Sequence, residues 1–234
     1  MRARVLGLVL VVGLTACGVS PEPAPTPDAV GAEAGSDWVS LFDGQTISEW
    51  RGYKQEGVPD GWQVVDGTIT RVGPGVDLVS REQYSDFEFA FEWKLPPGGN
   101  SGIMFRVTED LAQTYHSGPE FQLLDNAGHA DGKNPLTSVG ANYAIQAPTR
   151  DASRPVGEWN TGRLLVDGTH VEHWLNGEKV VEYELGTPEW TALVAESKFN
   201  VYPTYGRQPT GHVVLQEHGD AVAYRNLRIR VLSR

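Results

Sequence analysis

The sequence predicts an all-β protein, with two antiparallel sheets packed as a jelly-roll sandwich and one short helix. Three observations predict this class. Apolar and polar residues alternate with period two in several runs after Trp38, as in strands with one buried face. Asp-Gly or Asn-Gly pairs interrupt three runs. The chain also holds 27 Gly and 15 Pro but only 2 Met, which favours turns and strands over a helical bundle.

The clearest strand is residues 87–94, where Phe or Trp occupies every second position. Three hairpins are expected where Asp-Gly or Asn-Gly separates two strand-like runs, because both central residues of such a two-residue turn take positive φ. These turns are expected at Asp66-Gly67, Asp167-Gly168 and Asn176-Gly177. Strands at this spacing, in roughly 200 residues, are typical of a two-sheet sandwich.

One short helix is expected, from Pro188 to about Lys198. Thr187 has a side chain suited to the N-cap, Pro188 fits the first helical position and Glu189 lies in the first turn. The helix is short enough to act as a lid or a plug.

Residues 1–16 resemble a bacterial lipoprotein signal peptide. Arg2 and Arg4 precede a short apolar stretch, and Thr15 and Ala16 precede Cys17. The stretch is too short to span a bilayer. The resemblance implies cleavage before Cys17 and lipidation of its sulfur. The protein is therefore expected to be lipid-anchored at the bacterial cell envelope, on a periplasmic or extracellular face, and at the outer membrane if the cell has one.

Residues 17–36 are rich in proline and alanine and are expected to form a tether. Residues 37–234 are expected to form the folded domain. With 30 acidic and 19 basic residues, the formal charge is −11. Because such a chain has no surplus of lysine and arginine to neutralise a phosphate backbone, no nucleic-acid partner is expected. The single cysteine leaves no internal disulfide.

Three predicted strands carry apolar residues on one side and hydrogen-bonding or titratable residues on the other. They lie within residues 102–107, 120–125 and 212–218. The polar sides carry Arg106, Glu120, Gln122, Gln216 and His218. On neighbouring strands these side chains would form one face suited to the hydroxyl groups of a sugar. A solvated sheet face is also polar, but it favours Thr, Lys and Ser, so we favour a ligand-binding face.

Several motifs occur in a fixed order along the chain. They are residues 38–44, 100–106, 120–126, 157–160, 174–177, 215–219 and 224–227. In order and spacing they resemble the 3-keto-disaccharide hydrolase family. The resemblance implies a concanavalin A-like jelly roll whose concave sheet faces a saccharide. It also implies cleavage, by elimination and hydration, of a sugar that a partner dehydrogenase has already oxidised at C3.

This chemistry needs a base near C2, a cation or donor at the C3 oxygen and an acid for the leaving group. Glu120 or His218 is the expected base, and the other member of the pair is the expected acid. Arg106 is the expected cation. Gln122 and Gln216 are expected to hold hydroxyl groups. Three further substrate-binding residues are expected at Asp125, His129 and Lys198.

Asp125, His129 and Asp131 lie within one loop after the Glu120 strand. Two carboxylates and an imidazole could hold a divalent cation that polarises the C3 ketone. Asp, Asn and Gly are also the residues that turns require. Because the spacing matches no defined metal motif, we favour the turn, and no cofactor is certain.

A non-catalytic carbohydrate-binding module is the competing class, because a fold does not fix a function. A binding module needs stacking aromatic residues and neutral hydrogen-bonding groups. It has no use for an arginine, a glutamate and a histidine with tuned pKa values. The sequence therefore favours an enzyme.

Overall fold

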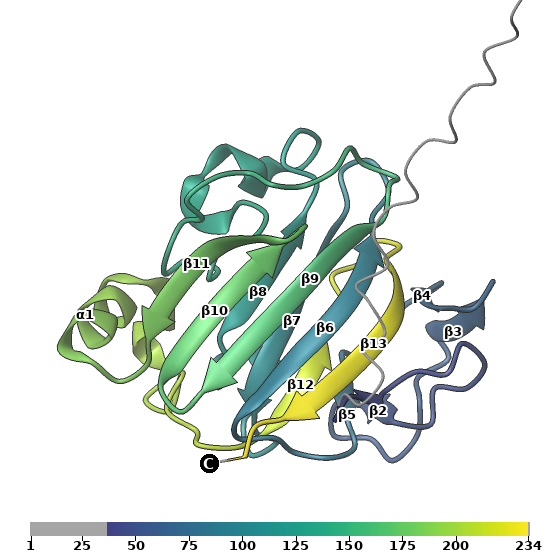
Figure 1. Ribbon diagram of the computed structural model, residues 1–234, viewed down its shortest axis with the longest axis horizontal. Helices are drawn as coiled ribbons and strands as arrows, with labels where there is room; N and C mark the ends of the chain where they lie inside the picture. The colour runs from purple at the N-terminus through teal and green to yellow at the C-terminus, as the bar shows by residue number, and fades with distance from the viewer. Residues whose placement is uncertain (1–36, 234) are drawn as a thin grey trace, which may run out of the picture. The chain divides into compact units, whose positions relative to one another are not determined.

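The computed structural model describes residues 37–233, and in this range it confirms the two antiparallel sheets. The larger sheet has eight strands, in the order β11 (Glu178–Glu184), β10 (His170–Leu175), β9 (Asn160–Asp167), β6 (Phe87–Lys94), β13 (Ala223–Val231), β4 (Thr68–Arg71) and β3 (Trp62–Val65), with β1 (Val39–Ser40) paired to β13. The smaller sheet has five, in the order β2 (Trp50–Gly52), β5 (Leu78–Ser80), β12 (His212–Leu215), β7 (Asn100–Val107) and β8 (Glu120–Leu124). Strands β9, β6 and β13 lie over β8, β7 and β12 (Figure 1).

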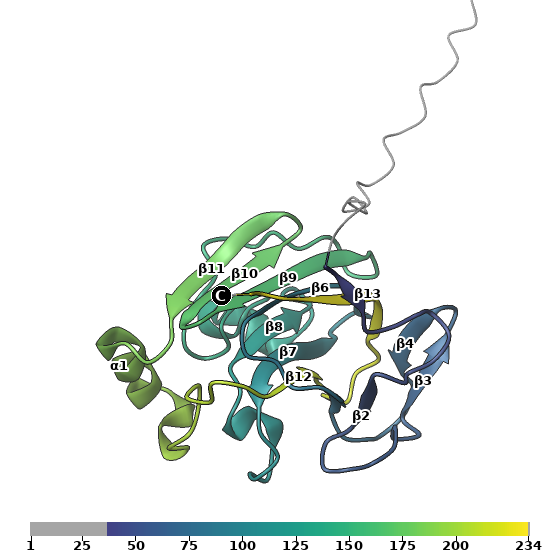
Figure 2. The ribbon, with the colours of Figure 1, turned by 60° about the horizontal axis from the view of Figure 1, so that its bottom comes forward.

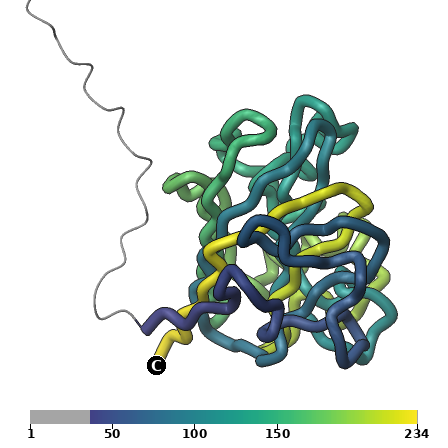
Figure 3. Tube along the Cα trace, turned by 90° about the vertical axis from the view of Figure 1, so that its right-hand side faces the viewer, coloured from purple at the N-terminus to yellow at the C-terminus, as the bar shows by residue number. Residues whose placement is uncertain are grey.

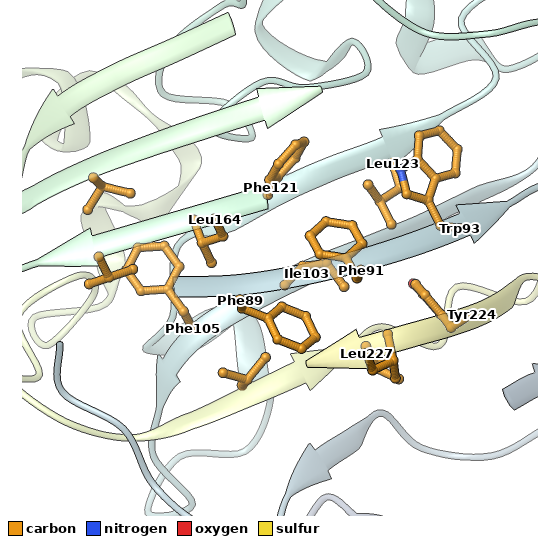
Figure 4. Close-up of a cluster of buried hydrophobic side chains, with 14 of the residues drawn as sticks. Phe89, Phe91, Trp93, Ile103, Phe105, Phe121, Leu123, Leu164, Tyr224 and Leu227 are labelled. Carbon is orange, nitrogen blue, oxygen red and sulfur yellow. The ribbon is translucent and has the colours of Figure 1, made fainter. Parts of the chain in front are cut away.

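The core lies between the two sheets and is strongly aromatic (Figure 4). Every second residue of β6 is buried, as the alternation predicts. Phe89 and Phe91 stack with ring centroids 5.3 Å apart, and Phe91 meets Phe121 of β8 edge to face at 5.8 Å. The contact between Phe91 and Phe121 joins the two layers directly. Aromatic side chains bury large apolar areas and favour such geometries.

Two of the three predicted hairpin turns are confirmed. Asp66 and Gly67 have φ of 48° and 73°, and Asn176 and Gly177 have φ of 50° and 84°. The third turn is shifted by one residue. Asp167 pairs with His170, so the central residues are Gly168 and Thr169, and of these only Gly168 has positive φ. A glycine at the first central position alone is the pattern of a type II′ turn.

The predicted helix is confirmed as α1 (Pro188–Glu196), the one α-helix in the described range. The Thr187 Oγ1 atom accepts a hydrogen bond from the backbone N–H of Trp190 at 3.1 Å, as an N-cap does. The helix lies beyond β11, at the edge of the larger sheet (Figure 2). A short 3₁₀ helix, η4 (Lys198–Val201), follows it. No helix formed by residues 37–233 is long and apolar enough to cross a membrane.

The two ends of the described chain lie side by side. Val39 of β1 pairs with Ile229 of β13. In Figure 3 the purple start of the described chain runs beside its yellow end. The predicted signal peptide, Cys17 and the tether lie outside the described residues and stay predictions.

Candidate active site

The candidate site lies on the face of the smaller sheet that points away from the core. On β8, Phe121 and Leu123 enter the core, whereas Glu120 and Gln122 take the opposite side, as predicted. They line a pocket of about 140 Å³. The pocket is lined by Asn100, Tyr115, Glu120, Gln122, Tyr143, Lys198, Phe199, Gln216 and His218. The structure thus brings together five predicted residues, Glu120, Gln122, Lys198, Gln216 and His218.

Glu120 is the buried carboxyl group of this pocket, with 4% of its surface exposed. It lies against Gly102 of β7, where a Cβ atom would overlap the carboxyl group. The side-chain amide of Gln216 lies near the carboxyl group and favours its charged form. Burial raises the pKa of Glu120 to about 8, with smaller opposite contributions from Lys198 and Gln216. A carboxyl group of this pKa exchanges protons near neutral pH.

The segment after η3 (Pro135–Thr137) covers the free edge of β8. The backbone N–H of Tyr143 donates to the Glu120 carbonyl at 3.0 Å, which fixes Tyr143 beside the pocket. Its hydroxyl donates to Asp131 Oδ2 at 3.2 Å. Burial, followed by the nearby carboxylates, raises the pKa of Tyr143, so this hydroxyl stays protonated.

Lys198 brings a positive charge to the same place. Its Nζ lies 4.2 Å from the centre of the Tyr143 ring and 5.3 Å from that of Phe199. The short helix η4 holds it there, because the Ser197 hydroxyl accepts a hydrogen bond from the Phe199 N–H at 3.1 Å. An ammonium group over aromatic faces is held electrostatically and remains exposed to a ligand.

Three amide oxygens around the pocket have no hydrogen-bond partner among the described residues. They are Asn100 Oδ1, Gln122 Oε1 and Gln216 Oε1. The nitrogens of two of these amides are engaged: Asn100 Nδ2 contacts His218 Nε2 at 3.3 Å, and Gln122 Nε2 donates to the Thr137 carbonyl at 3.2 Å. Because unpaired buried acceptors are costly, these oxygens are suited to accept hydrogen bonds from hydroxyl groups.

His218 lies at the mouth of the pocket, and 43% of its side chain is exposed. Its ring lies 6.0 Å from the ring of His129, measured between centroids. His129 Nδ1 accepts a hydrogen bond from the backbone N–H of Asp131 at 3.1 Å. His218 is thus accessible, whereas His129 is committed to its own loop and does not line the pocket.

Arg106 does not lie in this pocket, and the expectation that it does is wrong. Its guanidinium donates to the carbonyls of Ser85 and Gly168, each at 2.8 Å, and pairs with Asp86 at 3.2 Å. The cause is a β-bulge. Val107 pairs with His212 and Met104 with Val214, so two β7 residues oppose one β12 residue, and Arg106 takes a φ of 50°. The alternation therefore reverses at Arg106.

Residues 125–131, the candidate cation loop, form a turn. Asp125 Oδ2 accepts a hydrogen bond from the Gly98 N–H at 2.7 Å, and Oδ1 accepts one from the Ala127 N–H at 3.1 Å. Backbone hydrogen bonds, chiefly that from Gly98, lower the pKa of Asp125. Asp125 lines a separate cavity rather than the Glu120 pocket. This loop therefore fits a cation poorly, because its candidate ligands are already engaged.

Four lining residues were not predicted as site residues: Asn100, Tyr115, Tyr143 and Phe199. Asn100 begins β7, and the three aromatic residues lie in loops or 3₁₀ helices. Loops have no periodicity that assigns a side chain to a face. The available signal was the occurrence of large aromatic residues in segments without strand alternation.

Fold and site together define a two-sheet jelly-roll protein with a small polar pocket around one buried carboxyl group. Residues 37–230 match the family model described as the 3-keto-alpha-glucoside-1,2-lyase-like domain. The chain belongs to this family, as the sequence motifs suggested.

Three similar proteins show how far the similarity extends. A protein of Bacteroides thetaiotaomicron named 3-keto-disaccharide hydrolase is 36% identical, over 84% of this chain and 79% of its own. A crystal structure from Parabacteroides distasonis, titled "putative glycosyl hydrolase", is 33% identical with a TM-score of 0.78, over 84% of this chain and 94% of its own. A carbohydrate-binding module from Bacillus subtilis, CBM66, shares the fold at a TM-score of 0.50 and 12% identity, over 78% and 95% of the two chains.

Proposed function

We propose that this protein cleaves the glycosidic bond of 3-keto-glycosides, including 3-keto-disaccharides, by elimination followed by hydration. The family membership supports a sugar substrate. One observation carries the mechanism: among the described residues, Glu120 is the only carboxyl side chain that lines the pocket.

A conventional glycosidase uses two carboxyl groups on either side of the scissile bond, because its transition state resembles an oxocarbenium ion. A ketone at C3 removes this need. It acidifies the hydrogen on C2, so that one base can start the reaction. A pocket with one carboxyl group, one imidazole and one ammonium group fits elimination better than direct displacement.

Glu120 is the proposed base. It takes the C2 proton, and the electron pair of the C2–H bond passes into an enolate with negative charge on the C3 oxygen. A general base works best when its pKa lies near the working pH, and burial sets the pKa of Glu120 to about 8. Gln216, which lies near the carboxyl group, is the proposed residue that orients it.

Lys198 replaces Arg106 as the proposed partner of the enolate oxygen, because it is the cation that reaches this pocket. When the enolate collapses, a C1–C2 double bond forms and the C1–O bond breaks. His218 is the proposed acid that protonates the departing oxygen. Water then adds across the double bond, with hydroxyl at C1 and hydrogen at C2, to release a 3-keto-sugar.

Asn100, Gln122 and Gln216 are the proposed partners of the substrate hydroxyl groups, through their unpaired oxygens. The substrate must first be oxidised at C3, so a sugar 3-dehydrogenase is the proposed upstream partner. The cell envelope is the proposed location of the reaction, and the resemblance of residues 1–16 to a lipoprotein signal peptide supports this proposal.

The test compares a 3-keto-disaccharide with the same disaccharide in unoxidised form. We expect release of the leaving sugar from the keto form alone. Glu120→Gln should lower kcat by roughly a hundredfold or more, as loss of a general base does, whereas Glu189→Gln on the exposed face of α1 should have no effect. Binding of both sugars without turnover would instead identify a carbohydrate-binding module.

A further inference from the structure

The pocket around Glu120 is too small for a whole disaccharide. Pockets that enclose a drug-sized molecule measure roughly 300–1,000 Å³, whereas this pocket measures about 140 Å³. If the reacting keto-sugar occupies the pocket, as the proposed function requires, the leaving group lies outside it. The rim of the pocket therefore decides which leaving groups are accepted.

Three aromatic rings gather at this rim. Tyr115 lines the pocket and is 38% exposed. The ring of His116 lies 4.7 Å from that of Tyr115, edge to face, and stacks on the ring of Tyr202 at 4.1 Å. Tyr115 and Tyr202 are 6.3 Å apart. The rings support one another, although they come from distant parts of the chain.

The backbone that carries Tyr115 is anchored, although its side chain is exposed. Tyr115 belongs to the 3₁₀ helix η1 (Thr114–His116), and the Thr114 carbonyl accepts hydrogen bonds from the N–H groups of Ser117 and Gly118, both at 3.2 Å. The buried Thr114 hydroxyl donates to Asp77 Oδ2. Asp77 Oδ1 accepts a hydrogen bond from the N–H of Glu217, the residue before His218, at 2.7 Å. Asp77 thus ties the Tyr115 helix to the His218 segment.

None of the three rim residues Tyr115, His116 and Tyr202 carries a permanent charge. Burial lowers the pKa of His116, which favours its neutral form. Val201, beside Tyr202, adds an apolar side chain that is 66% exposed. Aromatic rings pack well against flat apolar surfaces, and the hydroxyl of a tyrosine can still bond to a polar ligand. A pyranose ring and an aryl group both offer such a surface.

We infer that Tyr115, supported by His116 and Tyr202, forms the subsite for the leaving group and selects neutral leaving groups with a flat apolar face. This inference rests on the proposed function for its catalytic readout. It predicts that the protein discriminates between glycosides of one keto-sugar by the group attached at C1.

The test measures kcat/KM for three 3-keto-α-glucosides, with methyl, phenyl or glucosyl as the group at C1. Tyr115→Ala should lower kcat/KM for the phenyl or the glucosyl compound by about five- to tenfold, the range that aromatic contacts supply, and leave the methyl compound nearly unchanged. Tyr115→Phe should keep the wild-type preference. The compound with the larger loss shows whether an aryl group or a sugar is the better occupant.

An equal loss on all three compounds, or no loss on any, would overturn the subsite. Thermal melting checks that each variant is folded. If the wild-type protein cleaves none of the compounds, the proposed function fails. The subsite is then tested by the affinity of the protein for the same compounds. The phenyl compound should then bind more tightly than the methyl compound, and Tyr115→Ala should abolish the difference. Equal binding by the wild-type protein would reject the subsite as well.

Discussion

The carboxyl group of Glu120 occupies the space above Gly102 where a side chain would otherwise stand. The two residues lie on neighbouring strands, with Glu120 opposite Met104 and Gly102 opposite Gln122. Because β7 carries no Cβ at this position, the carboxyl group can lie flat against the sheet and become buried. The glycine thereby helps to set both the position and the pKa of the proposed base.

Gly102→Ala should therefore displace the Glu120 carboxyl group while leaving the sheets intact. We expect kcat/KM for a 3-keto-disaccharide to fall by about tenfold or more, because small misplacements of a reacting group are costly. Gly57→Ala is the matched control, since a Cβ there would meet nothing within 4 Å. Equal activities of the two variants would show that Gly102 does not position Glu120.

The pKa of Glu120 predicts how stability depends on pH. Its ordinary value of 4.5 is raised to about 8 by burial, so between these values the folded state binds a proton that the unfolded state has released. The contribution of Glu120 to the free energy of unfolding is thus fully present below about pH 4.5 and is lost as the pH rises through about 8. Glu120→Gln should therefore melt at a higher temperature than the wild type at pH 8, and the difference should shrink toward pH 5. A difference that does not vary with pH would show that Glu120 is ionised throughout this range.

Arg106 is expected to act on stability rather than on catalysis. Arg106→Ala leaves the carbonyl groups of Ser85 and Gly168 without this donor, which should cost about 1–3 kcal/mol of unfolding free energy. Chemical denaturation measures this loss. At a temperature where the variant is folded, its kcat should remain close to the wild-type value. A large loss of kcat with unchanged stability would show that Arg106 takes part in catalysis.

The start of the chain predicts a lipid anchor on Cys17. Cys17→Ser should move the protein from the membrane fraction to the soluble fraction of the producing bacterium, because the lipidated sulfur is lost. Ser20→Ala, three residues further on, is the control and should stay with the membrane. Equal membrane binding of both variants would contradict the lipoprotein interpretation.

Local patterns predicted the sheet elements well. Residues 87–94 alternate because one face of β6 packs into the core, and Asn176-Gly177 forms its turn because both residues accept positive φ. The bulge at Arg106 could not be predicted in this way. It arises where β7 pairs with β12, and β12 lies more than a hundred residues later in the chain. No pattern within residues 102–107 predicts it.

Strand alternation predicted part of the site. Glu120 and Gln122 follow from the alternation in β8. Tyr143 reaches the pocket through a backbone hydrogen bond to Glu120, and Tyr115 through the anchoring of Thr114 to Asp77. These contacts join distant segments, so no spacing along the chain reveals them.

The central claim is that cleavage begins with removal of the C2 hydrogen. The most direct measurement is turnover of a 3-keto-glycoside in heavy water, with the isotope content at C2 of the released keto-sugar determined by mass spectrometry and NMR. Elimination and hydration should place deuterium at C2 at the rate of turnover, beyond the spontaneous exchange measured without enzyme, and Glu120→Gln should suppress both together. Release of the leaving group with the original hydrogen retained at C2 would contradict the claim and leave direct hydrolysis as the mechanism.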